Sequence, residues 1–254
     1  MSGDRKKAYE VLEEAYFGEN KHESPEIDRL PEILDGVKCF ADVGASLGQY
    51  SYYANKALKG AKFYCVEADP DKASRLRELT QQWSDESTNT FEIVERAASD
   101  KEEELTFFVP TDHLSSGALF EIPGATSDWK ELKVKATTLD KIFEGVEVDF
   151  LKLDVEGAEY RALVGARNLL TRCNLRLLLE IAPWGDKKEN HQPSDVVNFL
   201  AKMGYGFSVY ENHYLFEKKG VAPVRWLKCK ALGFILDRPG LKIHVKNLFN
   251  RIRS

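Results

Sequence analysis

Two spacings of hydrophobic positions alternate along the chain, and the change from one to the other predicts where strands end and helices begin. Short apolar runs are followed by segments in which apolar residues recur every three or four positions. Repeated from Val37 to Met203, this alternation is typical of parallel strands joined by helices. Two final alternating runs, Tyr205–Tyr210 and His213–Lys218, predict an antiparallel pair. The pattern therefore predicts an α/β fold.

The first predicted strand begins at Val37 and leads into a glycine-containing turn, after which a helical pattern starts at Tyr50. This is the layout of a buried strand that feeds a ligand-binding loop and a helix. Glycine lets the backbone approach a ligand closely, because no Cβ is in the way. The residues of this turn that we predict to bind a cofactor are Gly44, Ala45, Ser46 and Gly48.

Two acids at strand ends narrow the choice of cofactor. A dinucleotide site favours Gly-x-Gly-x-x-Gly, whereas this turn reads Asp42-x-Gly44-x-x-x-Gly48. A carboxylate there would repel a diphosphate and would suit the sulfonium and ammonium groups of S-adenosylmethionine. Glu67, at the end of the next predicted strand, is placed to accept hydrogen bonds from ribose hydroxyls. Ordinary turn chemistry is the competing explanation for Asp42.

An irregular stretch follows the third predicted strand, Phe91–Ala98, whose end at Ala98 is where the adenine would lie. Two short β runs, Leu105–Val109 and Leu132–Thr138, flank a polar loop. Such an excursion at the ligand edge of a sheet is a reasonable place for an acceptor to bind. The polar residues that we predict to contact the acceptor there are His113, Ser115 and Ser116, although an exposed histidine is more often simply solvated.

The strongest signal is a charged strand, Phe150–Val155, which is apolar except for Lys152 and Asp154 before the chain turns at Glu156. Burying such charges without partners costs several kcal/mol each, so they must pair or lie at the open strand end. A further strand ends at Glu180. Since strand ends of a parallel sheet meet at one edge, we expect one cleft to be lined by Asp42, Glu67, Asp154 and Glu180. A purely structural charge cluster is the alternative.

These charges suggest how the chemistry would proceed. Methyl transfer requires the acceptor oxygen to be held about 3 Å from the methyl group and to lose its proton. Asp154 is the first candidate for orienting or deprotonating the acceptor, as well as a cofactor contact, and Glu180 is the second candidate. Lys152 is predicted to pair with one of them, and Glu156 to contact the acceptor. A divalent ion bridging the three acids is a variant that suits hard oxygen ligands, but no spacing demands it.

From Phe40 to Pro183 the sequence resembles the FkbM-type S-adenosylmethionine-dependent methyltransferases. The segments that carry the resemblance are Asp42–Gly48, Val66-Glu67 followed by Asp69-Pro70, Thr138–Asp140, and above all Asp149–Glu159 with Leu163 and Gly165-Ala166 after it. The resemblance implies a class I methyltransferase fold with a seven-stranded sheet, cofactor contacts at Asp42, Gly44 and Glu67, and methylation of a hydroxyl, often on a sugar or natural product. Three residues depart from the family pattern: Ser46 for Asn, Ala68 for Pro, and Ala182 for a polar residue. An NAD-dependent oxidoreductase and a non-catalytic binding module on the same fold are the alternatives.

Composition supports one soluble globular chain of 254 residues, 43% hydrophobic and 30% charged, and excludes disordered and repeat proteins. The basic start is not followed by an apolar run, and no segment has the roughly 18 apolar residues of a membrane span. With four cysteines and no Cys-x-x-Cys, a reducing and cytoplasmic location is predicted. We expect a small-molecule or glycan acceptor and no nucleic acid.

Two appendages flank the predicted methyltransferase domain, which spans residues 36–220. Residues 1–35 are helical and acid-rich, which indicates a helix packed on the core or, alternatively, a lid over the cofactor. Residues 221–254 hold eight Lys or Arg and one Asp, a net charge of 8 − 1 = +7, and an apolar stripe at helical spacing. This segment is predicted to act at an anionic surface such as a membrane leaflet, with packing on the protein's own sheet or on a second subunit of a homodimer as the alternative.

Overall fold

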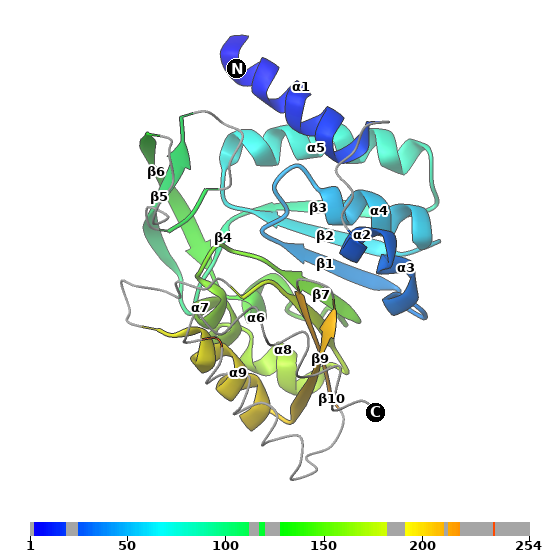
Figure 1. Ribbon diagram of the computed structural model, residues 1–254, viewed down its shortest axis with the longest axis vertical. Coiled ribbons are helices and arrows are strands. Elements are labelled where there is room, and N and C mark those ends of the chain that lie inside the picture. Colours follow the sequence, from blue (N-terminus) through cyan, green and yellow to red (C-terminus); the bar gives the residue numbers. More distant parts are fainter. Residues whose placement is uncertain are drawn as a thin grey trace.

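A seven-stranded sheet forms the centre of the protein (Figure 1). The computed structural model describes residues 3–18, 25–111, 117–119, 128–181, 191–210, 213–218 and 236. The strand order is β3-β2-β1-β7-β8-β10-β9, in which only β10 runs antiparallel to its neighbours. The strands are β1 (Cys39–Val43), β2 (Lys62–Glu67), β3 (Thr90–Glu95), β7 (Phe150–Leu153), β8 (Arg176–Leu179), β9 (Tyr205–Tyr210) and β10 (His213–Lys218). The predicted mostly parallel sheet is confirmed.

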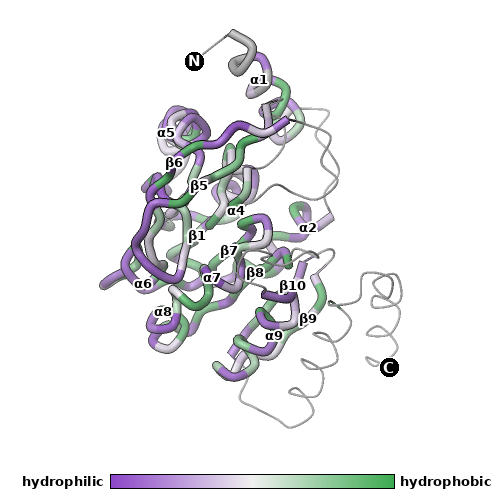
Figure 2. The backbone as a smooth tube through the Cα atoms, turned by 90° about the vertical axis from the view of Figure 1, so that its left-hand side faces the viewer, coloured by the Kyte–Doolittle hydropathy of each residue, from purple (hydrophilic) through white to green (hydrophobic). Residues whose placement is uncertain are grey.

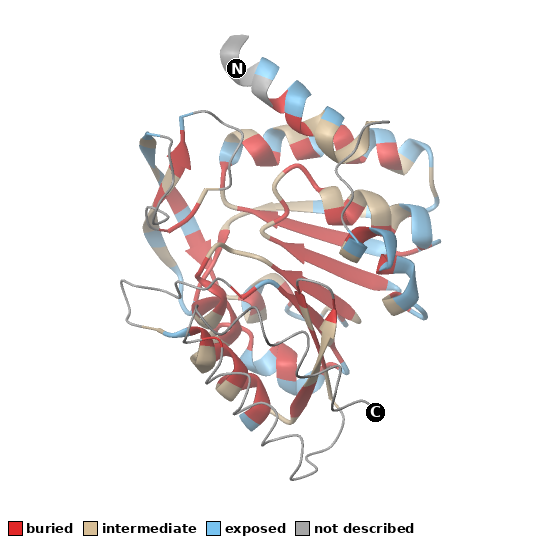
Figure 3. Cartoon of the chain, viewed as in Figure 1, coloured by how far each residue is buried: buried red, intermediate tan, exposed pale blue. Residues whose placement is uncertain are grey.

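Helices cover both faces of this sheet because successive side chains of each strand point to opposite faces. Phe40 and Phe63 pack towards the helices of one face, and Ala41 and Val43 pack towards those of the other. The first face carries α1 (Gly3–Phe17), α2 (Pro25–Asp28), α3 (Leu30–Ile33), α4 (Gln49–Ala57) and α5 (Pro70–Asp85). The second carries α6 (Leu139–Ile142), α7 (Glu159–Val164), α8 (Arg167–Arg172) and α9 (Pro193–Lys202). In Figure 3 the central strands β1, β2, β7 and β8 are almost entirely buried, whereas β3 and the outer sides of the helices are partly exposed.

Local signals in the sequence explain where several helices begin. Asp69 caps α5, because its Oδ1 accepts hydrogen bonds from the N–H groups of Asp71 and Lys72 at 2.9 and 3.4 Å. Helix α9 starts with reciprocal bonds between Gln192 and Asp195. Figure 2 shows hydrophobic and hydrophilic residues alternating around α9, as expected for a helix with one buried side.

A second, three-stranded sheet has the order β4-β6-β5, formed by β4 (Ala97–Ala98), β5 (Glu103–Pro110) and β6 (Trp129–Thr137). The prediction of one strand over Phe91–Ala98 is therefore wrong. The chain leaves the large sheet at Arg96, whose N–H donates to the carbonyls of Glu67 and of Val94, both at 3.0 Å. The bond from residue 96 back to residue 94 closes a tight three-residue turn, and this turn directs β4 into the small sheet.

After Gly157 the apolar residues Tyr160, Leu163, Val164, Leu169 and Leu170 recur at helical spacing and predict one helix, but the structure has two, α7 and α8. A Cβ on Gly165 would lie 2.0 Å from the carbonyl oxygen of Ser99, so the chain approaches another segment too closely here for a side chain. Asp140 caps the second helix, because its carboxylate accepts from the N–H groups of Asn168 and Leu169 at 3.0 and 2.7 Å. The acidic residue of the Thr138–Asp140 motif thus starts α8.

The predicted central domain, residues 36–220, is flanked by two further segments. Helix α1 packs against the first face through the buried residues Tyr9 and Leu12, as one of the two interpretations of residues 1–35 expected. The segment Val221–Ser254 lies outside the described residues except for Leu236, so its predicted role stays a prediction. Within the described ranges, no helix is long and apolar enough to cross a membrane.

Candidate functional site

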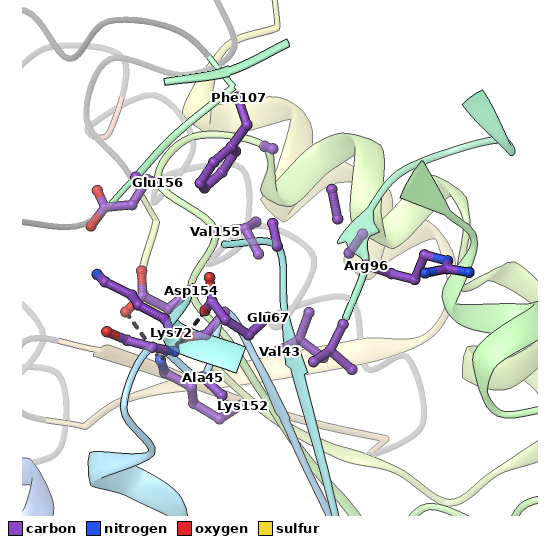
Figure 4. A pocket seen from close by; sticks show the side chains of 18 of the residues that line it. Val43, Ala45, Glu67, Lys72, Arg96, Phe107, Lys152, Asp154, Val155 and Glu156 are labelled. Atoms are coloured by element: carbon purple, nitrogen blue, oxygen red, sulfur yellow. Dashed lines mark hydrogen bonds and ion pairs between the residues drawn. The ribbon is translucent and has the colours of Figure 1, made fainter. Parts of the chain in front are cut away.

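A cavity of about 850 Å³, counting its part open to solvent, lies at the carboxyl ends of β1, β2 and β7. The charged and polar residues of its lining include Ser46, Lys152, Asp154 and Glu156. The apolar residues of its lining include Phe107 and Leu119. Figure 4 shows Glu67, Lys72 and Asp154 close together, with Phe107 across the cavity and Arg96 extending away from them.

The turn after β1 forms the floor of the cavity and depends on its first glycine. Gly44 has φ +78°, and a Cβ at this position would lie 1.7 Å from the carbonyl oxygen of Asp154. The N–H groups of Gly44 and Ala45 both donate to the carbonyl of Val66, at 2.9 and 3.1 Å. The turn is therefore clamped between β2 and the end of β7, and only glycine fits its closest approach.

Glu67 lies at the end of β2, is 7% exposed, and lines the cavity. Its Oε2 accepts a hydrogen bond from the Ser46 N–H at 2.7 Å, and its Oε1 accepts one from the Asp69 N–H at 2.8 Å. Burial raises the pKa of Glu67, while the positive charge of Lys72 acts in the opposite direction. Two backbone bonds fix both oxygens, and each oxygen has a second lone pair with which to accept from a ligand hydroxyl.

Lys152 is buried among carboxylates on the face of the sheet that α4 covers. It stands opposite Asp42 in the register of β1 and β7, and parallel neighbours in register point to the same face. Its Nζ lies 3.1 Å from Oδ2 of Asp154 and 3.8 Å from Oδ1 of Asp42. Burial would lower the pKa of Lys152, but Asp154 and Asp42 outweigh it and raise the pKa. The ammonium group therefore stays charged and holds the two carboxylates.

Asp42 itself is not among the residues that line the cavity. It is 1% exposed, and its Oδ2 accepts from the hydroxyl and the N–H of Ser51 at 2.7 and 3.2 Å. Burial raises the pKa of Asp42, whereas Lys152 and Ser51 lower it. Ser51 and Lys152 thus contact the carboxylate that was predicted to face a cationic ligand. Asp42 instead links α4 to the strand that carries Lys152.

Glu180, at the end of β8, lies beside a buried histidine instead of in the cavity wall. Its Oε2 is 3.7 Å from Nε2 of His213, which in turn is 3.0 Å from the hydroxyl of Tyr50, a cavity residue. Burial and then Lys152 lower the pKa of His213 to about 4, so the ring is neutral at pH 7. The Glu180 side chain is 55% exposed, and partial burial with the charges of Asp154 and Glu156 raises its pKa to about 7.

The predicted residues divide into three groups. Those that line the cavity are Gly44, Ala45, Ser46, Glu67, Ala98, Lys152, Asp154 and Glu156. Those that do not are Asp42, Gly48 and Glu180; Gly48 instead starts α4 with φ +83°. Those outside the described residues are His113, Ser115 and Ser116.

Sequence reasoning missed several lining residues, chiefly Tyr16, Lys72, Arg96 and Phe107. Arg96 carried a usable signal, because a charged residue late in an apolar strand often marks a strand end. Among the residues that the structure describes, no three His, Cys, Asp or Glu side chains are grouped to hold a metal ion, and this includes Asp154, Glu156 and Glu180.

The chain is similar to several solved methyltransferases. Methyltransferase FkbM from Methylobacillus flagellatus KT is 16% identical, with 84% of this chain and 50% of that chain covered and a TM-score of 0.48, so the chain spans half the length of that protein. An O-methyltransferase family protein from Burkholderia thailandensis is 11% identical over 87% of this chain and 61% of that chain, with a TM-score of 0.48. The SAH-bound methyltransferase of Podospora anserina is 11% identical over 86% and 89%, with a TM-score of 0.45.

A comparison with curated proteins found no match. The family model for the methyltransferase FkbM domain, however, matches residues 42–207, more than half of the chain. The protein therefore belongs to the FkbM methyltransferase family.

Proposed function

We propose that this protein transfers a methyl group from S-adenosylmethionine to a hydroxyl oxygen of a sugar, a glycan or a natural product. The observation that carries the proposal is that two carboxylates, Asp154 and Glu156, line the cavity. Asp154, paired with buried Lys152 at 3.1 Å, lines the cavity with Glu156. A hydroxyl is a weak nucleophile until its proton is removed, and a carboxylate fixed beside it supplies that step.

The residues of the cavity fit the cofactor of the family. Its ribose hydroxyls suit Glu67, whose oxygens retain lone pairs beyond their two backbone bonds. Its adenine suits the apolar residues Ala98 and Phe107, and its charged amino-acid portion suits the charged residues Lys152, Asp154 and Glu156. When bound, the cofactor supplies an electrophilic methyl group on a sulfonium. Asp42 acts in this proposal as a positioning residue, because its carboxylate contacts Lys152 and Ser51.

Three residues are assigned roles in orienting and deprotonating the acceptor hydroxyl. Asp154 orients the hydroxyl and is the first candidate to take its proton, since it lies on the cavity wall. Lys152 holds the Asp154 carboxylate in place through an ion pair of 3.1 Å. Glu180 is the second candidate, and its pKa of about 7 is close to the value that suits a general base at neutral pH.

Calorimetry separates this proposal from its alternatives. The chain should bind S-adenosylmethionine and S-adenosylhomocysteine and should not bind NAD. Binding of NAD alone would select an oxidoreductase. Incubation of cell extracts with methyl-labelled cofactor then identifies the acceptor. Release of the label by mild alkali would indicate a methyl ester in place of the alkali-stable ether expected for a hydroxyl acceptor. Cofactor binding without transfer to any extract would support a non-catalytic module.

The role of Asp154 is tested on the identified acceptor. Asp154→Asn should lower kcat by about 100-fold or more while leaving the protein folded. Glu131→Gln, a neutralised acid on the exposed side of β6, is the matched control and should keep full turnover. Full turnover in Asp154→Asn would show that the proton goes elsewhere, and Glu180→Gln is then the next variant. Loss of turnover in EDTA would favour the variant with a divalent ion.

A further inference from the structure

Helix α1 brings an aromatic side chain into the cavity from outside the region that the family model matches. Tyr16 lies near the end of α1, well before residue 42, where the match begins. It lines the cavity together with Ser46, Lys152 and Asp154. We propose that Tyr16 is a cofactor-binding residue, whose phenol donates a hydrogen bond to the carboxylate of the cofactor's amino-acid portion. This inference rests on the assignment of the cofactor to this cavity.

Three contacts hold Tyr16 in position from different sides. The hydroxyl of Tyr53 on α4 donates to the carbonyl oxygen of Tyr16 at 3.0 Å. One turn earlier, the carboxylate of Glu13 receives two hydrogen bonds from the guanidinium of Arg75 on α5, at 2.7 and 2.8 Å. The next residue, Phe17, packs into an aromatic cluster on the same two helices. A side chain on so fixed a backbone loses little conformational freedom when it binds a ligand.

The polarity of the cavity indicates which part of the cofactor lies near Tyr16. The cofactor has an apolar purine at one end and a zwitterionic amino acid at the other. Phe107 and Leu119 supply the apolar wall, whereas Tyr16 belongs with the charged residues Lys152, Asp154 and Glu156. Opposite charges attract most strongly where burial reduces solvent screening, so we place the amino-acid portion of the cofactor beside Tyr16 and these charged residues.

The chemistry of Tyr16 suits a donor to a carboxylate. Burial raises the pKa of its phenol, while Lys152 and a hydrogen bond with the Ser46 side chain act in the opposite direction, so the group keeps its proton at neutral pH. Lys152 adds positive potential at the same place, which favours an anionic group. Asp154 and Glu156 suit the neighbouring ammonium of the zwitterion. One phenol, one ammonium and two carboxylates thus complement both charges of the amino acid.

The test compares two ligands that differ only at this end. S-adenosylhomocysteine carries the amino-acid portion, and 5′-methylthioadenosine keeps the adenosine but lacks it. Calorimetry should show that Tyr16→Phe weakens S-adenosylhomocysteine by about 10- to 100-fold, the loss expected for a hydrogen bond to a charged group. The affinity for 5′-methylthioadenosine should stay within about twofold of the wild-type value.

Tyr52→Phe is the matched control, because it makes the same change in the same aromatic cluster on a residue that does not line the cavity. It should change neither affinity. Tyr53→Phe is the second variant, since it removes the hydroxyl that positions Tyr16, and it should weaken S-adenosylhomocysteine selectively but by a smaller factor.

Two results would overturn the inference while leaving the cofactor assignment intact. In the first, Tyr16→Phe binds S-adenosylhomocysteine as tightly as the wild type does. In the second, the variant loses affinity for both ligands equally, which would indicate a structural effect on the whole cavity. If the wild-type chain binds neither adenosyl ligand, the assignment of the cofactor to this cavity fails, and the inference fails with it.

Discussion

Replacing Gly44 by alanine tests the close approach on which the cavity floor depends. A Cβ there would lie 1.7 Å from the Asp154 carbonyl oxygen, and real Cβ contacts stay above 3.0 Å. The carbonyl has little room to move, because the Asp154 N–H is bonded to the carbonyl of Val43 at 3.0 Å. A left-handed backbone costs an alanine about 1–2 kcal/mol, and forced overlap in a packed site costs about 1–3 kcal/mol. Gly44→Ala should therefore destabilise the protein by about 2–5 kcal/mol.

Gly145→Ala provides the matched control. Gly145 has φ +72°, close to the +78° of Gly44, but a Cβ there would meet no heavy atom within 4 Å. It should cost only the left-handed penalty of about 1–2 kcal/mol. Urea unfolding of both variants gives the difference, and calorimetry should show loss of S-adenosylhomocysteine binding in Gly44→Ala alone. If the two variants are equally stable and both bind the ligand, the close approach has no energetic consequence and the reasoning is wrong.

Three further predictions concern ionisable side chains. Lys152→Met should lower the free energy of unfolding by about 3–5 kcal/mol in urea titrations, because it leaves two carboxylates uncompensated, and adding Asp42→Asn should restore part of it. Burial raises the pKa of Glu159 to about 8, so the folded state holds the proton more tightly than the unfolded state does. Stability is therefore lost as pH rises, by about 3 kcal/mol between pH 5 and pH 7, and Glu159→Gln should remove most of this slope. If Glu180 is the base, kcat/KM should fall as pH drops below about 7, and Glu180→Gln should remove that dependence.

Periodicity predicted the large sheet well because its central strands are buried on both faces and two of them are followed by a turn signal, Gly44 or Asp69. Periodicity failed where the deciding interaction lies between distant residues. The segment Phe91–Ala98 contains no glycine or proline, and its break depends on the Arg96 N–H reaching the carbonyl of Glu67. The division between α7 and α8 likewise depends on the backbone of Ser99 lying against Gly165.

In the site, too, local signals could be read from the sequence, whereas contacts between distant residues could not. Glu67 and Asp154 were found because a carboxylate at the end of a buried strand is costly away from an open edge. The pairing of Asp42 with Lys152 was not predicted, since the two residues are 110 positions apart in the sequence and only the register of β1 and β7 brings them together. Tyr16 lies on the helix face that also carries Tyr9 and Leu12, and spacing alone does not distinguish a residue packed on the core from one that lines a cavity.

The division of the cavity between two sheets has a consequence for how the family can diversify. The floor is locked by the contact between Gly44 and Asp154, so almost any change there disturbs the register of the large sheet. The wall that carries Phe107 belongs to the antiparallel pair β5 and β6, which is joined to the large sheet through the short strand β4. Residues can be inserted between Pro110 and Trp129 without moving any strand that holds the floor. Natural selection can thus remodel one side of the cavity while the other side is inherited unchanged.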